Sequence, residues 1–348
     1  MATYLFIFFH FIQSLFFAHS EPLAEKPTAT KIVYRSSDGG HTWLDVSIGL
    51  PKDVALNTVI ATDKEIILGS DRGLYIGHTT CSAILWQEDL GLGKSISNLS
   101  NGWAGLYVTS YGNGIFQKLI GTEIWVPMDK TLEDKMVRTI LEIPGGSVLV
   151  ATDNGIYKSI DGRKTWKQVF SEGMILNMFY SDGVIIAGGF KGLLRSVDNG
   201  ENWVWAFTGD GMGLSAGTIN GHMVAITSGM GPWGKENLAP FGIKTNRIRT
   251  SDDGGQTWIR ADAGLSGALL NPELLRKNMR NGVQFRPSAI NDIEQQGNYI
   301  FCSLDAGVYR SSDLGKTWEL VLSSGGNSSF ELVVSGGVIY AVSVFSGC

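Results

Sequence analysis

The stretch SDDGGQTW, residues Ser251–Trp258, is one copy of a short box with the pattern Ser-x-Asp-x-Gly-x-Thr-Trp. Full copies also occur at Ser36–Trp43 (SSDGGHTW) and Ser311–Trp318 (SSDLGKTW). In each box the Asp can accept hydrogen bonds from the backbone of its own turn, and the Gly permits a positive φ. We therefore expect each box to be a structural hairpin turn, followed by a Trp that is largely buried between neighbouring sheets.

Two further boxes match the pattern with one change each. The box Ser159–Trp166 (SIDGRKTW) carries Arg163 where Gly is expected, and the box Ser196–Trp203 (SVDNGENW) carries Asn202 in place of Thr. Self-similarity at a spacing of 20–50 residues is the sequence signature of a repeat fold. The boxes therefore indicate a repeat architecture, and nothing in their composition requires catalysis.

Two more units have lost the box but keep its frame, from Gly73 to Trp86 and from Gly114 to Trp125. The seven units end at Trp43, Trp86, Trp125, Trp166, Trp203, Trp258 and Trp318. Successive tryptophans are 43, 39, 41, 37, 55 and 60 residues apart, so the last two units are longer than the others.

One unit shows the expected strands. Its apolar segments are Val137–Ile143, Ser147–Thr152, Ile156–Ile160 and Thr165–Phe170, and glycine-rich turns or the box separate them. Four short antiparallel strands in about 40 residues are typical of a propeller blade. The sequence predicts an all-β, seven-bladed β-propeller over residues 31–348.

The two ends of the repeat region complement each other. The first unit starts at Lys31–Tyr34 with only its third and fourth strands, and Phe330–Cys348 holds only a first and a second strand. We expect these segments to form one blade together, which closes the ring, leaves no unpaired sheet edge there and makes the domain complete.

The composition excludes several classes of protein. The 45 glycines, with 18% charged residues, argue against a helical bundle, and a net charge of −5 argues against nucleic-acid binding. The three cysteines, Cys81, Cys302 and Cys348, form neither a metal motif nor a disulfide framework, and Cys302 is expected to be buried in a strand. The histidines are scattered and no phosphate-binding loop is present, so we expect no metal and no cofactor.

The N-terminus has a different character. The segment Leu5–Phe17 is almost wholly apolar, and Ala18-His19-Ser20 follows it. This pattern predicts a signal peptide at residues 1–20, a leader at 21–30 and a secreted or periplasmic protein without a membrane span in the mature chain. An uncleaved anchor is the alternative, because no Lys or Arg precedes the apolar run.

The boxes make the chain resemble the Asp-box (BNR-repeat) β-propellers, which include sialidases, xyloglucan-cleaving glycosidases, sortilin-type receptors and the photosystem II stability/assembly factors. In scale the chain looks most like the photosystem II factors. The resemblance implies that the boxes are structural and lie away from any active site. The implied structural residues are Ser36, Asp38, Gly40, Trp43, Asp161, Trp166, Asp198, Trp203, Asp253, Gly255, Trp258, Asp313, Gly315 and Trp318.

The enzymes among these families fit the sequence poorly. Sialidases place an Arg-Ile-Pro motif before the first box, whereas the similar string here, Phe285-Arg286-Pro287, comes late and lacks the Ile. Glycoside hydrolysis needs two facing carboxyls about 5–10 Å apart. The residues Asp71, Asp153 and Asp305 occupy equivalent turns, where Asx turns are expected. We predict no catalytic residue; a sialidase-like glycoside hydrolase is the first alternative, and a peptide-binding receptor propeller is the second.

Two insertions are the best indication of function. They span residues 229–246 and 263–289, and strand alternation places both on the face opposite the boxes, with a short helix expected at Pro272–Arg280. They carry a net charge of +4 in a chain whose remainder carries −9, which predicts a site for an acidic protein or an anionic glycan. We expect the protein to be a monomer. The predicted partner-binding residues are Trp233, Lys235, Lys244, Arg276, Lys277, Arg280 and Arg286. The alternative site is the set of short turns around the channel, at Asp71, Arg72, Asp153, Lys191 and Asp305.

Overall fold

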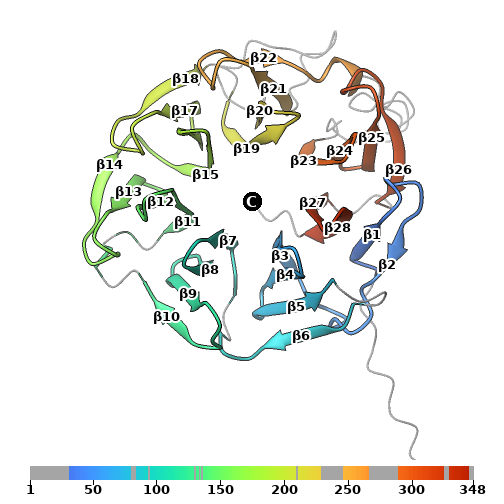
Figure 1. Ribbon diagram of the computed structural model, residues 1–348, viewed down its shortest axis with the longest axis horizontal. Helices are drawn as coiled ribbons and strands as arrows, with labels where there is room; N and C mark the ends of the chain where they lie inside the picture. The colour runs from blue at the N-terminus through green and yellow to red at the C-terminus, as the bar shows by residue number, and fades with distance from the viewer. Residues whose placement is uncertain are drawn as a thin grey trace, which may run out of the picture.

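The computed structural model has seven four-stranded antiparallel sheets arranged as blades around a central axis (Figure 1). It describes residues 31–79, 84–92, 95–128, 131–132, 134, 136–208, 211–228, 246–265, 289–324 and 329–344. In these ranges the only helical element is the 3₁₀ turn η1 (Ala263–Leu265). The prediction of an all-β, seven-bladed propeller is confirmed.

Blades are numbered from the one that holds the chain ends, and strands are given from the axis outward. Blade 1 consists of β27 (Ser329–Ser335), β28 (Val338–Val344), β1 (Val33–Ser36) and β2 (Leu44–Asp45). Blade 2 consists of β3 (Leu56–Ala61), β4 (Glu65–Ser70), β5 (Leu74–His78) and β6 (Trp86–Asp89). Blade 3 consists of β7 (Asn98–Gly102), β8 (Gly105–Ser110), β9 (Gly114–Leu119) and β10 (Trp125–Pro127).

The remaining blades follow in chain order. Blade 4 consists of β11 (Val137–Glu142), β12 (Val148–Thr152), β13 (Gly155–Ser159) and β14 (Lys167–Phe170). Blade 5 consists of β15 (Ile175–Ser181), β16 (Val184–Gly189), β17 (Gly192–Ser196) and β18 (Val204–Thr208). Blade 6 consists of β19 (Gly213–Ile219), β20 (His222–Thr227), β21 (Arg247–Ser251) and β22 (Ile259–Arg260). Blade 7 consists of β23 (Ile290–Gln296), β24 (Tyr299–Leu304), β25 (Gly307–Ser311) and β26 (Glu319–Ser323).

The core of the molecule lies between the blades. The second strands β4, β12, β16 and β24 are buried along almost their whole length, because each is covered by a neighbouring blade on both faces. The outermost strands β2 and β22 are exposed. Cys302 is fully buried in β24, as the sequence predicts.

The chain ends close the ring as the sequence predicts. The strand β1 pairs with β28, and this ladder joins Val33 to Val342 and Ser36 to Ile339. Carboxylates on the innermost strands tie this blade to both neighbours. The Leu332 amide donates to Asp292 Oδ2 of blade 7 over 2.7 Å, and the Val59 amide of blade 2 donates to Glu331 Oε2 over 2.9 Å.

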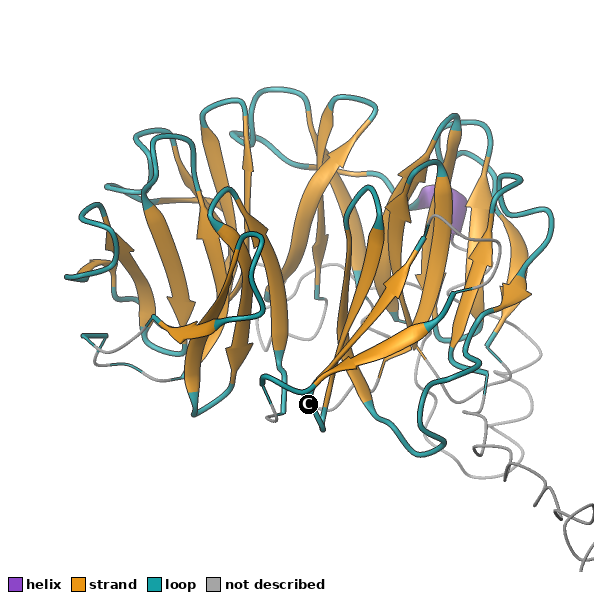
Figure 2. Cartoon of the chain, turned by 60° about the horizontal axis from the view of Figure 1, so that its bottom comes forward, coloured by secondary structure: helices purple, strands orange, loops and turns teal. Residues whose placement is uncertain are grey.

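The two long connections lie where the spacing of the units places them. One joins β20 to β21 and the other joins β22 to β23. Because successive strands are antiparallel, Thr227 at the end of β20 pairs with Arg247 at the start of β21, and the blade 6 box follows the other end of β21. Figure 2 shows the strands running between the two faces of the ring, with turns at both ends. Residues 1–30 and the segment Pro272–Arg280 lie outside the described residues.

Candidate functional site

The boxes form closed hydrogen-bond networks. In blade 6, Ser251 Oγ and the Thr257 amide both donate to Asp253 Oδ1, over 2.8 Å each. Thr257 Oγ1 donates to Asp253 Oδ2 over 2.6 Å, and the Gly255 amide donates to Ser251 Oγ over 2.8 Å. The Thr257 hydroxyl, followed by its amide, lowers the pKa of Asp253 to about 2. The same network surrounds Asp38, Asp161, Asp198 and Asp313.

The box tryptophans lie between their own blade and the preceding one. Trp258 is 8% exposed and packs against Ile186 and Leu193 of blade 5, and its Nε1 donates to Gly255 O over 3.1 Å. The other four box tryptophans, and Trp86 and Trp125 of the units without a box, are of intermediate burial, which is less than that of Trp258. Each of these tryptophans directly precedes or begins the outermost strand of its blade, where solvent reaches one side of its indole ring.

The seven predicted partner-binding residues all lie outside the described residues, but the ends of the two long connections are described. Asn246 Nδ2 donates to Ile290 O over 2.9 Å, so the end of the first connection lies beside the end of the second. The next residue, Arg247 (2% exposed), pairs with the fully buried Asp262 over 3.2 Å. Arg260 Nε binds the same carboxylate over 2.7 Å. The described ends of both connections therefore lie next to the buried ion pair Arg247–Asp262.

The turn aspartates have different partners from those expected. Instead of closing Asx turns, Asp71 accepts the Ala55 amide and Asp305 accepts the Ala289 amide, over 3.2 and 3.1 Å. The reason is that each turn lies beside the linker that enters the first strand of its own blade. Of the other residues named there, Arg72 donates to Asp53 O, and Lys191 Nζ lies 3.7 Å from Glu172 Oε2.

The third of these aspartates, Asp153, binds side chains. It accepts hydrogen bonds from Arg138 Nε and Tyr111 Oη, both over 2.6 Å. Burial acts to raise the pKa of Asp153, but these two donors outweigh burial and hold the pKa below its usual value. The structure therefore does not bring these turn carboxylates together as a facing catalytic pair in any contact it records.

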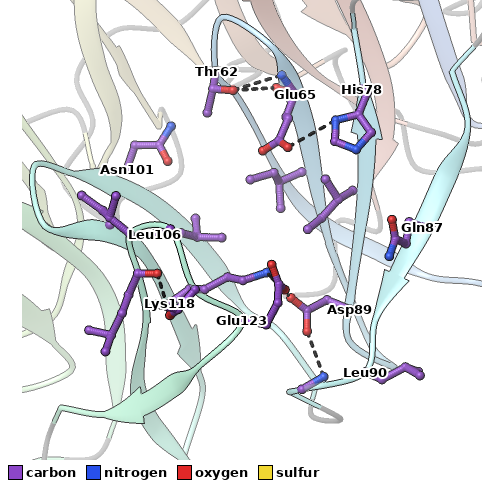
Figure 3. A pocket seen from close by; sticks show the side chains of 18 of the residues that line it. Thr62, Glu65, His78, Gln87, Asp89, Leu90, Asn101, Leu106, Lys118 and Glu123 are labelled. Atoms are coloured by element: carbon purple, nitrogen blue, oxygen red, sulfur yellow. Dashed lines mark hydrogen bonds and ion pairs between the residues drawn. The ribbon is translucent and has the colours of Figure 1, made fainter.

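A groove of about 890 Å³ between blades 2 and 3 was not anticipated (Figure 3). We call it the blade 2–3 groove. Its lining residues are Thr62, Glu65, Ile67, Ile76, His78, Gln87, Glu88, Asp89, Leu90, Gly91, Asn101, Gly102, Gly105, Leu106, Lys118, Leu119, Ile120, Gly121, Thr122 and Glu123. Four carboxylates and one lysine give this lining a net charge of −3 with His78 neutral. The signal in the sequence was the loss of the box in blade 3.

The interior of the blade 2–3 groove is partly neutralised. Lys118 Nζ lies 2.8 Å from Asp89 Oδ2 and 2.6 Å from Glu123 Oε2. Trp125 Nε1 donates to Asp89 Oδ1 over 3.3 Å. Glu65 pairs with His78 over 3.3 Å, and both side chains are at least one third exposed. Because Lys118 is the one lysine among four carboxylates in the lining, the lining remains negatively charged.

A second group of carboxylates lies on the innermost strands β23 and β27. Burial raises the pKa of Asp292 to about 6, although the Leu332 and Ile293 amides oppose it. Burial first, and then the charge of Asp292, raise the pKa of Glu294 and Glu331 to about 8. Asp292 and Glu294 line a cavity of about 100 Å³ against β19, which has room for a few water molecules. Glu331, a carboxylate inside the largely apolar strand β27, was a signal that could have revealed part of this group, whereas β23 is polar over most of its length.

Two negative findings apply to the described ranges alone. They hold no group of three or more His, Cys, Asp or Glu side chains placed to bind a metal ion. No helix among the residues that the structure describes is long and apolar enough to cross a membrane.

Comparison with known proteins gives the fold. No family model and no curated protein matches the sequence. An ancestral GH74 enzyme has a TM-score of 0.57 at 16% identity, over 85% of this chain and 48% of that one. YCF48 bound to D1 peptide has a TM-score of 0.55 at 17% identity, over 86% and 96% of the two chains. YCF48 from Cyanidioschyzon merolae has a TM-score of 0.56 at 14% identity, over 84% and 97%. This chain spans about half of the GH74 chain and nearly all of each YCF48 chain, and at these identities it shares with them the β-propeller fold.

Proposed function

We propose that this protein is a secreted or periplasmic binding or assembly propeller, and that its partner docks on the face with the β20–β21 and β22–β23 connections. The observation that carries the proposal is the hydrogen bond between Asn246 and Ile290, which holds the ends of the two connections together. Long loops on a rigid scaffold commonly carry binding function. The proposed partner is an acidic protein or an anionic glycan.

Charge supports this choice of partner. The two connections contain six basic and two acidic residues, in a chain whose net charge is −5. A local field of opposite sign to the rest of the molecule selects partners by charge and speeds their encounter. The buried pair Arg247–Asp262 links the residue that follows the first connection to the residue that precedes the second. Trp233 offers an aromatic contact in the first of them.

The test is binding of heparin and of a purified acidic protein to two variants of the full chain. Arg276→Ser/Lys277→Ser/Arg280→Ser removes three charges from the second connection. The control Lys64→Ser/Lys164→Ser/Lys316→Ser removes three exposed charges from turns at the opposite ends of the blades. We expect only the first variant to bind about tenfold or more weakly, with a loss that shrinks as salt rises. Equal affinity for both variants would refute the proposal.

The location outside the cytoplasm rests on residues 1–20. An apolar run followed by Ala18-His19-Ser20 is what a signal peptidase processes. N-terminal sequencing of the protein from a secreting host should find Glu21 as the first residue. A product that starts at Met1 and sediments with membranes would show an anchor instead.

A glycoside hydrolase is the second candidate, and the carboxylates on the innermost strands β23 and β27 favour it. With pKa values of about 8, Glu294 and Glu331 are protonated at neutral pH, as a general acid must be. The cavity beside Glu294, about 100 Å³, is smaller than the 300–1,000 Å³ typical of ligand sites. Turnover of fluorogenic glycosides by the wild type, lost in Glu294→Gln, would establish this function; no turnover would leave binding as the function.

A further inference from the structure

We propose that the blade 2–3 groove binds a basic hairpin turn of a partner protein, which occupies the position that a box turn fills at other blade junctions. This surface is separate from the face with the long connections and does not depend on what binds there. Three observations support this proposal. Box turns pack on the preceding blade at other junctions, no box turn packs at this junction, and the lining of the groove is acidic.

At three other junctions a box turn packs on the second strand of the preceding blade. A Cβ added to Gly255 of blade 6 would lie 2.5 Å from Ile186 Cδ1 of blade 5. A Cβ added to Gly200 of blade 5 would lie 3.0 Å from Leu149 Cδ1 of blade 4. Such close approach shows that the turns fill the space above these side chains. The blade 1 box packs on Phe301 of blade 7 in the same way.

The third strand of the preceding blade also binds the turn. Arg195 Nε of blade 5 donates to Gly254 O over 2.7 Å. Lys158 Nζ of blade 4 binds Glu201 Oε1 of the next box over 2.7 Å. Each junction of this kind therefore offers one apolar surface and one basic side chain to the incoming turn.

Blade 2 has the same two positions, but no box turn covers them. Ile67 pairs with Ile76 in the ladder, as Ile186 pairs with Arg195 in blade 5, and both isoleucines line the groove. The blade 3 turn closes as a short hairpin, in which the Leu119 amide donates to Ile124 O over 3.2 Å.

The reason lies in the turn residues of blade 3. Counting back from Trp125, Lys118, Ile120 and Ile124 stand where the boxes have Ser, Asp and Thr. Without those side chains the box network cannot form, and the space beside Ile67 and Ile76 stays open.

The charge of the opening selects a basic occupant. Glu65 lies on the blade 2 side and Glu123 lies on the blade 3 side (Figure 3). Glu88 of β6 also lines the groove, and Lys118 is already paired with two carboxylates. Apolar side chains accompany them, since Leu90 is 82% exposed and Ile120 is 70% exposed. A hairpin with lysines or arginines around an apolar residue would complement both features.

The size of the groove agrees with a folded turn. Its volume of about 890 Å³ lies within the range of 300–1,000 Å³ that is typical of specific ligand sites. The chain itself contains a suitable probe, because the blade 4 box hairpin YKSIDGRKTWKQ, residues 157–168, has four basic residues and one acidic residue. Tyr157 and Gln168 are paired in the ladder, so head-to-tail cyclisation preserves the hairpin and reduces the entropy cost of binding.

The experiment measures fluorescence anisotropy of this cyclic peptide with the full chain at low salt. We expect saturable binding by the wild type, weakened about tenfold or more in Glu65→Gln/Glu88→Gln. The matched control is Asp182→Asn/Asp252→Asn on blades 5 and 6. It removes two exposed charges, one of which pairs with a histidine as Glu65 does, and should bind like the wild type.

A second variant tests the shape of the groove. Lys118→Ser/Ile120→Asp/Thr122→Gly/Ile124→Thr rebuilds the box in blade 3 and should abolish peptide binding while the circular dichroism spectrum stays unchanged. Absence of binding by the wild type, or equal affinity for the wild type, the carboxylate variant and the rebuilt-box variant, would overturn the proposal. A linear scrambled peptide of the same composition that binds as tightly would also overturn it, because charge alone would then suffice. None of these outcomes bears on the face with the long connections.

Discussion

The junction of blades 5 and 6 and the junction of blades 2 and 3 have the same strands in the same order, yet one is closed and the other is open. In the first, the box places Gly255 against Ile186, and Trp258 is buried behind it. In the second, the turn before Trp125 leaves a groove of about 890 Å³. The difference arises from a few turn residues, and the β-ladders of both blades remain intact.

This comparison separates two roles of the repeat. The ladders and the apolar second strands build the ring, and they persist where the box is lost. The boxes cover the junctions, so their loss exposes surface without opening the ring. Loss of the motif can therefore expose a junction surface without unfolding the blade, because the buried second strands still hold it in place.

The largest expected effect is on the closed junction. Trp258→Ala should lower the free energy of unfolding by about 3–5 kcal/mol, because it removes a buried aromatic side chain and the hydrogen bond of its Nε1. Trp125→Ala in the open junction should cost about 2 kcal/mol, because that side chain is partly exposed. Chemical denaturation of both variants checks the comparison. Equal losses would mean that the two junctions are equally packed.

Much of the fold follows from the sequence because the information is local. Eight residues of each box encode the hydrogen bonds of one turn, as Ser251, Asp253 and Thr257 show. Counting boxes and their frames gives the number of blades. The half-units at the two ends give the ring closure that the β1–β28 ladder confirms.

The blade 2–3 groove and the carboxylates on β23 and β27 could not be predicted in this way, because both depend on neighbours that are distant in the sequence. The loss of a box near Ile120 matters only because Ile67 lies opposite, in another blade. Asp292 and Glu331 acquire their environment only when blade 7 meets blade 1, and Glu331 then reaches Val59 of blade 2. The hydrogen-bond partner of Asp71 was predicted wrongly for a similar reason, because the Ala55 amide in the linker before β3 binds its carboxylate.

Glycine substitutions probe the same two junctions more finely. Gly255→Ala should cost about 2–3 kcal/mol, because φ is +79° and the new Cβ would displace Ile186. Gly121→Ala, in the blade 3 turn, should cost only about 1 kcal/mol, because φ is +70° but nothing lies within 4 Å of the added Cβ. Thermal unfolding measures both. A larger loss for Gly121→Ala would show that the blade 3 turn is packed after all.

The basic side chain of the closed junction has a smaller role. Arg195→Leu should cost about 1–2 kcal/mol through loss of the hydrogen bond to Gly254 O. The reciprocal change Ile76→Arg in blade 2 should not stabilise the protein, because no box turn faces that position and Ile76 packs on the apolar cluster of this junction. If Ile76→Arg stabilised the protein as much as Arg195→Leu destabilises it, a turn would already occupy the groove.

The smallest expected effect is on the pH dependence of stability. It distinguishes the box at the junction of blades 5 and 6 from the carboxylates on the innermost strands. Asp253, with a pKa of about 2, stays ionised between pH 5 and 8.5, so the blade 6 box adds no pH dependence in that range. Glu294 has a pKa raised from 4.5 to about 8, so the folded chain binds a proton there that the unfolded chain releases. The stabilisation is complete below about pH 4.5 and is lost as the pH rises through 8. We expect Glu294→Gln to melt with the wild type at pH 5 and about 2 °C above it at pH 8.5. Identical melting temperatures at both values would show that solvent in the channel keeps Glu294 ionised.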